Sequence, residues 1–267
     1  MTRIAALLAK ELADLRGNPA VFVPALITGF FSIVMPFMIA VAVPYFTGEH
    51  LSDSSDFTIA AEMYQREPAA RHLDPEGAIQ AMIFQQFLIL LVLTPVAASM
   101  SVAAYAVVGE KQARTLEPLL ATPLTTFELL VAKILGALIP GMLLAGACFT
   151  VYVLGAALLA EPGVYQTLLV PRALMIMFLL GPLAALAALE MAVCVSSRVN
   201  DARSAQQIGA LIILPISGLL VAEFTNNLQL TIPLIGLMCL ALAILDVVVM
   251  SIAIRLFDRE SILTRWT

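Results

Sequence analysis

The chain has 267 residues, of which 61% are hydrophobic and only 12% charged, and its mean hydropathy is +0.98. Soluble domains carry about 25% charged residues, so this composition excludes a water-soluble protein and predicts one membrane domain over residues 1–267. The net charge of −5 and the scattered basic residues argue against nucleic-acid binding.

Residues 1–18 have apolar side chains at helical spacing. These side chains are Ile4, Leu7, Leu8, Leu12 and Leu15. The pattern predicts an amphipathic helix that lies along the membrane surface, and Asn18-Pro19 is expected to end it. The alternative is a plain cytoplasmic extension of the first membrane span.

Long apolar segments follow, and a helix needs about 20 such residues to cross a bilayer core of about 30 Å. Six spans are expected, at about 20–45, 81–108, 129–159, 173–195, 208–222 and 231–254, the fifth of them short. The predicted fold class is therefore an all-α integral membrane protein with six transmembrane helices and an N-terminal interfacial helix.

Residues 47–80 form the longest polar segment and are predicted to be an extracytoplasmic loop. Asp74, Pro75 and Glu76 have the order of an N-cap, a first-turn proline and a first-turn acid, which predicts the start of the second span. His50 and His72 could be metal ligands or pH sensors, but isolated histidines in an acidic loop are usually only solvated.

The loop between the second and third spans carries three acids and three bases between two long uncharged runs. It is expected to hold a short amphipathic helix that Thr115 caps and Pro123 ends, because a residue before proline leaves the helical region. Thr125 and Glu128 have the spacing of a capping box, which predicts that the next helix begins there. The alternative is an ordinary interfacial loop.

This loop resembles the cytoplasmic loop of type-2 ABC transporter permeases, the membrane subunits of ATP-driven exporters. The matching positions are Glu110, Thr115-Leu116-Glu117, Leu119-Leu120, Thr122-Pro123 and Glu128-Leu129-Leu130…Lys133. Arg114 stands where the family usually has glycine, and the family does not require Pro118. The resemblance implies two permease subunits, identical or related, and two ATPase subunits. It also implies a substrate path between the permeases and export of an amphipathic or ionic compound.

No segment matches Gly-x-x-x-x-Gly-Lys-Ser/Thr, the loop that holds nucleotide phosphates. The chain is therefore expected not to be an enzyme and to bind no cofactor, with ATP and Mg²⁺ on a separate ATPase that contacts the loop. For apolar docking to that ATPase we expect Leu116, Leu119 and Leu120. For polar contacts, or for holding the loop to the helix ends, we expect Glu110, Arg114, Glu117 and Glu128.

Basic residues predict the orientation in the membrane. Eleven of the fourteen lie in the termini, the 109–133 loop and the 196–207 loop, and three in the remaining loops. The positive-inside rule places the larger group in the cytoplasm. We therefore expect a multi-pass protein of the inner (plasma) membrane with both termini and the 110–128 loop cytoplasmic.

Two acids, Glu190 and Asp246, lie inside predicted spans, where a charge costs about 2.5 kcal/mol or more. They predict either an intramembrane polar site for a substrate, ion or proton, or an interhelical hydrogen bond that fixes packing. The alternative function is thus a self-sufficient proton- or ion-coupled transporter or channel that uses both acids. A membrane-embedded enzyme lacks a credible set of catalytic or metal-binding residues. An importer permease would need a different, glycine-containing loop.

Overall fold

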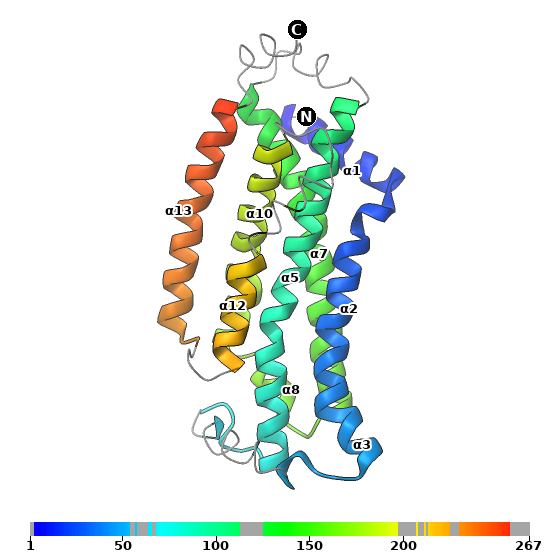
Figure 1. Ribbon diagram of the computed structural model, residues 1–267, viewed down its shortest axis with the longest axis vertical. Helices are drawn as coiled ribbons and strands as arrows, with labels where there is room; N and C mark the ends of the chain where they lie inside the picture. Colours follow the sequence, from blue (N-terminus) through cyan, green and yellow to red (C-terminus); the bar gives the residue numbers. More distant parts are fainter. Residues whose placement is uncertain are drawn as a thin grey trace.

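The computed structural model describes residues 3–53, 57, 64–65, 68–112, 125–196, 207, 211, 213–224 and 230–256. These residues form helices, and no strand occurs in any of these ranges. The long helices run side by side along the long axis of the molecule (Figure 1). They are α2 (Val23–Phe37), α5 (Pro75–Gln112), α7 (Thr126–Leu159), α10 (Gly181–Ser196), α12 (Ile213–Phe224) and α13 (Ile232–Leu256).

Shorter elements begin, extend or connect these helices. They are α1 (Arg3–Gly17), η1 (Pro19–Phe22), η2 (Met38–Ala42), α3 (Val43–Thr47), η3 (Leu51–Asp53), α8 (Val164–Thr167), α9 (Pro171–Met175) and η4 (Ile176–Leu180). Pro36 has no N–H to donate, and the helix widens after it into the π-helical turn η2. As predicted, α1 ends just before Asn18-Pro19.

Five helical segments are long and apolar enough to cross a membrane. They cover Pro19–Thr47, Pro75–Ala103, Thr126–Leu159, Pro171–Val195 and Ile232–Arg255, and they lie at the positions predicted for the first, second, third, fourth and sixth spans. At the predicted fifth position the described part of the chain has α12, whose 12 residues are too few to span by themselves. The count of six spans therefore stays a prediction.

Helix α5 is the centre of the bundle. It packs against α2, α7, α10 and α12, and its apolar segment is the most buried of the five. The face of α10 toward the interior is rich in alanine, with buried residues Ala184, Ala185, Ala187, Ala188 and Ala192. Small side chains let two membrane helices approach closely, which explains the extensive contact between α10 and α5.

An aromatic cluster joins α2, α5 and α7 at one depth. The ring of Phe37 lies 4.8 Å from that of Phe84 and 5.9 Å from that of Tyr152, and all three pairs meet edge to face. The Tyr152 hydroxyl donates a hydrogen bond of 2.8 Å to the carbonyl oxygen of Phe84. Gly155 makes room for this packing, because a Cβ there would stand 2.7 Å from the Phe37 ring.

Side chains from α5 also hold the connections at the end of the bundle where α3 and α8 lie. The Glu76 carboxylate accepts hydrogen bonds from the backbone N–H groups of Leu51 (3.2 Å) and Ser52 (3.0 Å). Asp74 caps α5 as predicted, with its Oδ1 accepting from the N–H of Gly77 at 2.9 Å. This end of the molecule is therefore fixed by local contacts to the first turns of α5.

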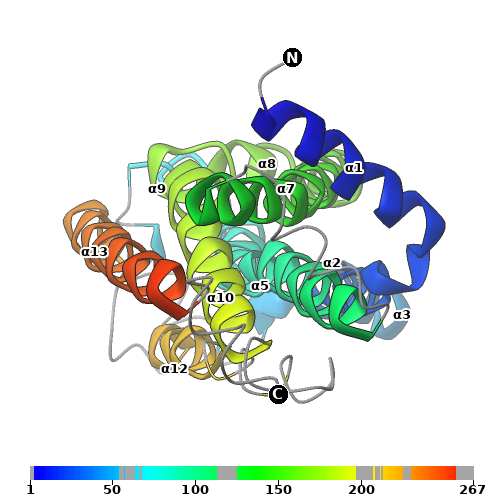
Figure 2. The same cartoon turned by 90° about the horizontal axis from the view of Figure 1, so that it is seen from above.

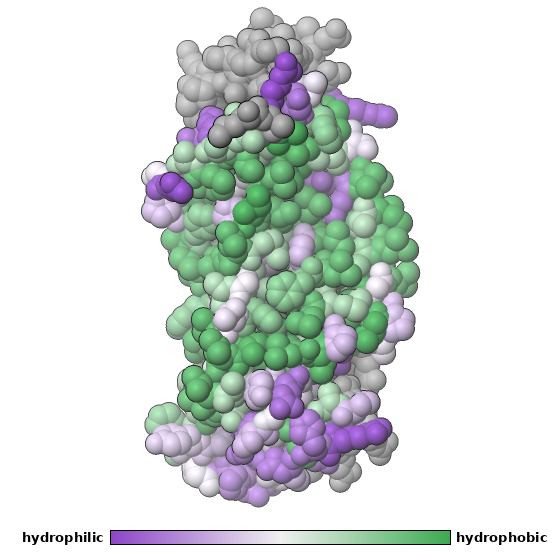
Figure 3. All heavy atoms as spheres, turned by 180° about the vertical axis from the view of Figure 1, so that it is seen from behind, coloured by the Kyte–Doolittle hydropathy of each residue, from purple (hydrophilic) through white to green (hydrophobic). Residues whose placement is uncertain are grey.

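The surface is apolar around the middle of the bundle and polar toward both ends (Figure 3). Large apolar side chains stand fully exposed on this middle belt, among them Leu143 on α7 and Val247 on α13. In water such a surface would be unfavourable, whereas in a bilayer it contacts hydrocarbon. The described fold is thus that of a protein that crosses a membrane several times.

Candidate functional site

The first turns of α7 and the last turn of α5 lie at the same end of the bundle as α1 and the ends of α10 and α13 (Figure 1). Most of the loop expected to contact an ATPase is outside the described residues: Arg114, Thr115, Leu116, Glu117, Leu119, Leu120 and Pro123. Glu110 belongs to the last turn of α5, and its side chain is also outside the description. The short coupling helix therefore stays a prediction.

The start of α7 is fixed by the predicted capping box. The hydroxyl oxygen of Thr125 accepts a hydrogen bond from the N–H of Glu128 at 3.2 Å. In return, Glu128 Oε2 accepts from the N–H of Thr125 at 2.9 Å and lies 3.0 Å from its hydroxyl. Glu128 thus holds the end of the loop to the helix, one of the two roles expected for it. Such a cap stabilises a helix by about 1 kcal/mol.

Helix α1 crosses the first turns of α7 at this end of the bundle (Figure 2). Leu7 on α1 is buried with Leu129 and Ala132 on α7, and Ile4 packs against this cluster. One turn further along, Gly136 lets the two helices approach closely, because a Cβ there would stand 2.9 Å from Cβ of Glu11. The apolar face of α1 is therefore packed, in large part, against α7.

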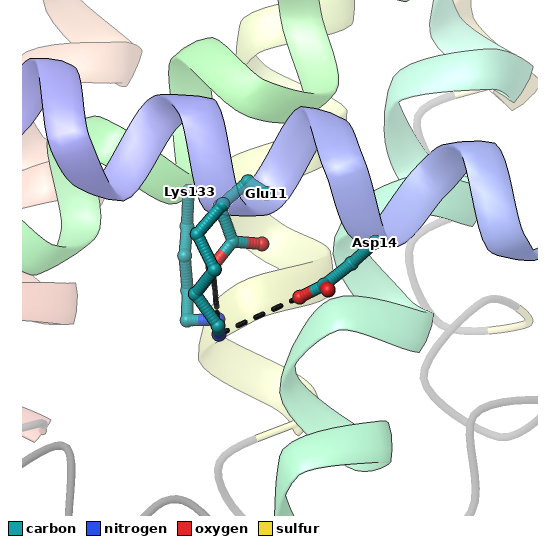
Figure 4. Close-up of polar contacts among 4 residues, drawn as sticks. Glu11, Asp14 and Lys133 are labelled. Atoms are coloured by element: carbon teal, nitrogen blue, oxygen red, sulfur yellow. Dashed lines mark hydrogen bonds and ion pairs between the residues drawn. The ribbon is translucent and has the colours of Figure 1, made fainter.

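A buried ion pair joins the same two helices (Figure 4). Lys133 Nζ donates a hydrogen bond of 3.1 Å to Glu11 Oε1, and the two side chains are only 3% and 9% exposed. Lys10, which is 43% exposed, lies 3.8 Å from Glu11 and 3.6 Å from Asp14. Two ammonium groups thus face two carboxylates, which satisfies the requirement that buried charges be paired.

Sequence reasoning did not identify Glu11 or its partner. A pair separated by 122 residues leaves no local spacing to find. The sequence does contain one indication of a buried ion pair. Glu11 lies four residues from Leu7 and four from Leu15, so it interrupts the apolar stripe of this helix. An acid in the apolar stripe of a docked helix requires a buried base opposite it, and Lys133 in the second turn of α7 fits that requirement.

The structure brings together the two intramembrane acids. Glu190 on α10 is 2% exposed and Asp246 on α13 is 4% exposed, and α10 packs along α13. Their carboxyl groups are close enough to interact electrostatically. Glu190 Oε2 and both carboxyl oxygens of Asp246 have no hydrogen-bond partner among the described residues. The interhelical hydrogen bond weighed as one explanation is thus not formed by these three atoms.

The described residues contain no group of three or more His, Cys, Asp or Glu side chains placed to hold a metal ion. Cys148, Cys194 and Cys239 form no disulfide bond among the described residues. The chemistry of the described part is therefore that of charge pairing and packing between helices.

Comparison with known proteins bears on what this arrangement is for. A family model described as "ABC-2 family transporter protein" matches residues 66–252, which is more than two thirds of the chain. No curated protein and no solved structure matches the sequence. The matched range includes the loop between α5 and α7 and both intramembrane acids. The chain therefore belongs to the ABC-2 transporter family, whose members are membrane permeases of ABC transporters.

Proposed function

We propose that the chain is the permease subunit of an ABC exporter, driven by a separate cytoplasmic ATPase through the 110–128 loop. The observation that carries this proposal is the way the start of α7 is held. Next to the loop, the capping box fixes the start of α7, and the buried Glu11–Lys133 pair joins its second turn to α1. A helix that receives mechanical work at its end needs this kind of fixed attachment.

Force applied to the loop has a direct route into the membrane. Helix α7 is continuous over 34 residues, or about 50 Å at 1.5 Å per residue, so it extends through the whole bilayer core. Since α1 is joined to α7 by an ion pair and apolar contacts, the two helices move together. ATP-driven closure of two ATPase subunits would thereby displace α7 relative to α5 and α10.

The complete transporter contains two permease subunits, identical or related, and two ATPase subunits that hold ATP and Mg²⁺. The substrate path lies between the permeases. In the inner membrane, the positive-inside rule supports cytoplasmic termini and a cytoplasmic 110–128 loop. Described basic residues agree with this orientation, since Arg3, Lys10, Arg16, Lys133 and Arg255 belong to the α1 end of the bundle.

The test is reconstitution of the chain in liposomes with a candidate ABC ATPase, chosen as a protein that has the phosphate-binding loop and is encoded next to this chain. We expect the two proteins to co-purify and the membrane complex to hydrolyse ATP. Charge reversal in the loop, Glu117→Lys, should abolish co-purification or uncouple hydrolysis from transport. The matched control is Glu49→Lys, an exposed acid near α3 at the other end of the bundle, and it should have no effect. A complex that is unchanged by Glu117→Lys would contradict the proposal.

A second candidate function is a self-sufficient proton- or ion-coupled carrier, which the unpartnered acids Glu190 and Asp246 favour. The same liposomes separate the two candidates. Movement of a cargo by the chain alone, with no nucleotide and no ATPase, would favour the second candidate and exclude the first.

A further inference from the structure

Two acids lie in the seam between α10 and α13, Glu190 and Asp246, and no described base is paired with either. Glu190 is six residues from the end of α10, or about 9 Å, and Asp246 is ten residues from the end of α13, or about 15 Å. Both therefore lie below the membrane surface at depths that an acidic side chain cannot span to reach water. Their burial among apolar residues is nearly complete.

The charges on the surrounding helices do not neutralise this pair. Helices α10 and α13 pack against each other and against α5, α7, α9 and η4. The charged side chains described on these elements are Glu76, Glu128, Lys133, Arg172 and Arg255. Glu76, Glu128 and Lys133 bind groups elsewhere, namely the η3 turn, Thr125 and Glu11. Arg172 lies in the first turn of α9 and Arg255 in the last turn of α13.

The remaining titratable groups on these elements are cysteine thiols and tyrosine hydroxyls, which carry no positive charge. Among the residues that the structure describes, the pair therefore has no counter-ion in this conformation.

The number of free oxygen atoms decides which cation fits between the acids. Hard metal ions need six or more oxygen ligands, whereas here three unpartnered carboxyl oxygens come from two side chains. The backbone carbonyls inside a helix are already engaged in its own hydrogen bonds. The side chains are too buried to admit a bulky organic cation. A proton satisfies each carboxylate without any further ligand.

We propose that Glu190 and Asp246 form an intramembrane proton-binding pair whose loss of protons separates α13 from α10. Each carboxylate takes up one proton from water when the helices are packed as in this structure, and releases it to water when the seam opens. Two ionised carboxylates in the closed seam would repel each other and lose their hydration, so ionisation favours the open seam. The inference concerns this seam alone and does not rest on the proposed function.

The chain carries its own probes of the seam. Cys194 follows Glu190 by four residues on α10, and Cys239 precedes Asp246 by seven residues on α13, so each thiol shares a helix face with one acid. Cys148 on α7 is an internal reference, since its sulfur lies beside Gly29 of α2. Reaction of all three with a membrane-permeant maleimide can be followed by mass spectrometry in the wild-type chain.

The direct test is infrared spectroscopy of the full chain in lipid bilayers at neutral pH. The difference spectrum between wild type and the Glu190→Gln/Asp246→Asn variant should show the loss of protonated-carboxyl bands. The control, Glu49→Gln, removes an exposed acid and should remove only carboxylate bands. Loss of carboxylate bands alone in the double variant would overturn the proposal. If that variant fails to fold, the wild-type chain itself should lose its protonated-carboxyl bands as pH is raised.

Seam opening is tested by the thiols. The labelling rates of Cys194 and Cys239, each divided by that of Cys148, should rise severalfold with pH in wild type. These two ratios should not change with pH in the double variant, nor in either single variant, Glu190→Gln or Asp246→Asn. Constant ratios in wild type, or an equal rise in the variants, would overturn the proposal. The measurement needs no ATPase, so its failure would leave the proposed permease function untouched.

Discussion

Removal of the Lys133 side chain is expected to release α1 from α7. In Lys133→Ala the Glu11 carboxylate stays in a site where it is 9% exposed, but its hydrogen-bonded partner is gone. A charge cannot stay buried without compensation, so α1 must detach, or Glu11 must take up a proton. Either outcome weakens the docking of α1.

The size of the effect follows from the geometry. At 3.1 Å and an effective dielectric constant of about 20, the attraction between Lys133 and Glu11 is about 5 kcal/mol, much of it offset by desolvation. Breaking a buried pair by removing one partner costs about 3–5 kcal/mol. Lys10 remains 3.8 Å from Glu11 but is 43% exposed, and such pairs contribute about 1 kcal/mol or less. We therefore expect a loss of about 3 kcal/mol.

Hydrogen exchange measures this loss locally. A docking free energy lower by about 3 kcal/mol speeds exchange of the buried α1 amides by about a hundredfold, at 1.36 kcal/mol per factor of ten. The double variant Glu11→Leu/Lys133→Met should restore slow exchange, because an apolar pair can replace a buried ion pair at little cost. Lys10→Ala is the surface control and should change docking by less than about 1 kcal/mol. Unchanged exchange in Lys133→Ala would refute the reasoning, as would exchange in the double variant as fast as in the single one.

Four further substitutions test the cap and the packing of α7. Gly136→Ala should weaken α1 docking by about 1–3 kcal/mol, because the new Cβ would stand 2.9 Å from that of Glu11. Gly146→Ala, on the same helix but with open space around it, should instead be neutral or slightly stabilising in a thermal unfolding assay. Thr125→Ala should cost about 1 kcal/mol and speed exchange in the first turn of α7, and unchanged exchange there would contradict the cap. Tyr152→Phe removes a buried hydroxyl that donates a hydrogen bond to a carbonyl of α5, so it should lower the free energy of unfolding by about 1–2 kcal/mol. An unchanged free energy of unfolding would show that this hydrogen bond does not contribute to stability.

Features that depend on neighbouring residues were predictable from the sequence. Five spans follow from the length of apolar runs. The capping box at Thr125, the N-cap at Asp74 and the break at Asn18 depend on spacings of one to three residues, and the structure has all three. Local chemistry determines such features, so no knowledge of tertiary contacts was needed.

Features that depend on distant residues were not predictable. The Glu11–Lys133 pair forms only because α1 docks on α7, and hydropathy gives no register for that docking. Glu76 was expected to act on the helix dipole of α5, whereas its carboxylate also binds two N–H groups of the η3 turn. Similarly, the short helix α8 lies between the predicted third and fourth spans, where the sequence analysis named no helix.

The predicted fifth span overlaps α12, an apolar helix that packs against α5. This packing contributes free energy that the helix sequence alone does not provide, and it depends on contacts that composition does not reveal.

The ring cluster of Phe37, Phe84 and Tyr152 packs α7 against α2 and α5 at one point, about which α7 can tilt. Tyr152 lies 26 residues, or about 39 Å, from the first residue of α7 and seven residues, or about 10 Å, from its last. A tilt about this point reduces a displacement at the loop end roughly fourfold at the far end, because the ratio of the two arms is about four. Large displacements near the 110–128 loop would thus leave the connections at the other end of α7 almost still, and distances between spin labels at the two ends of α7 would measure that ratio.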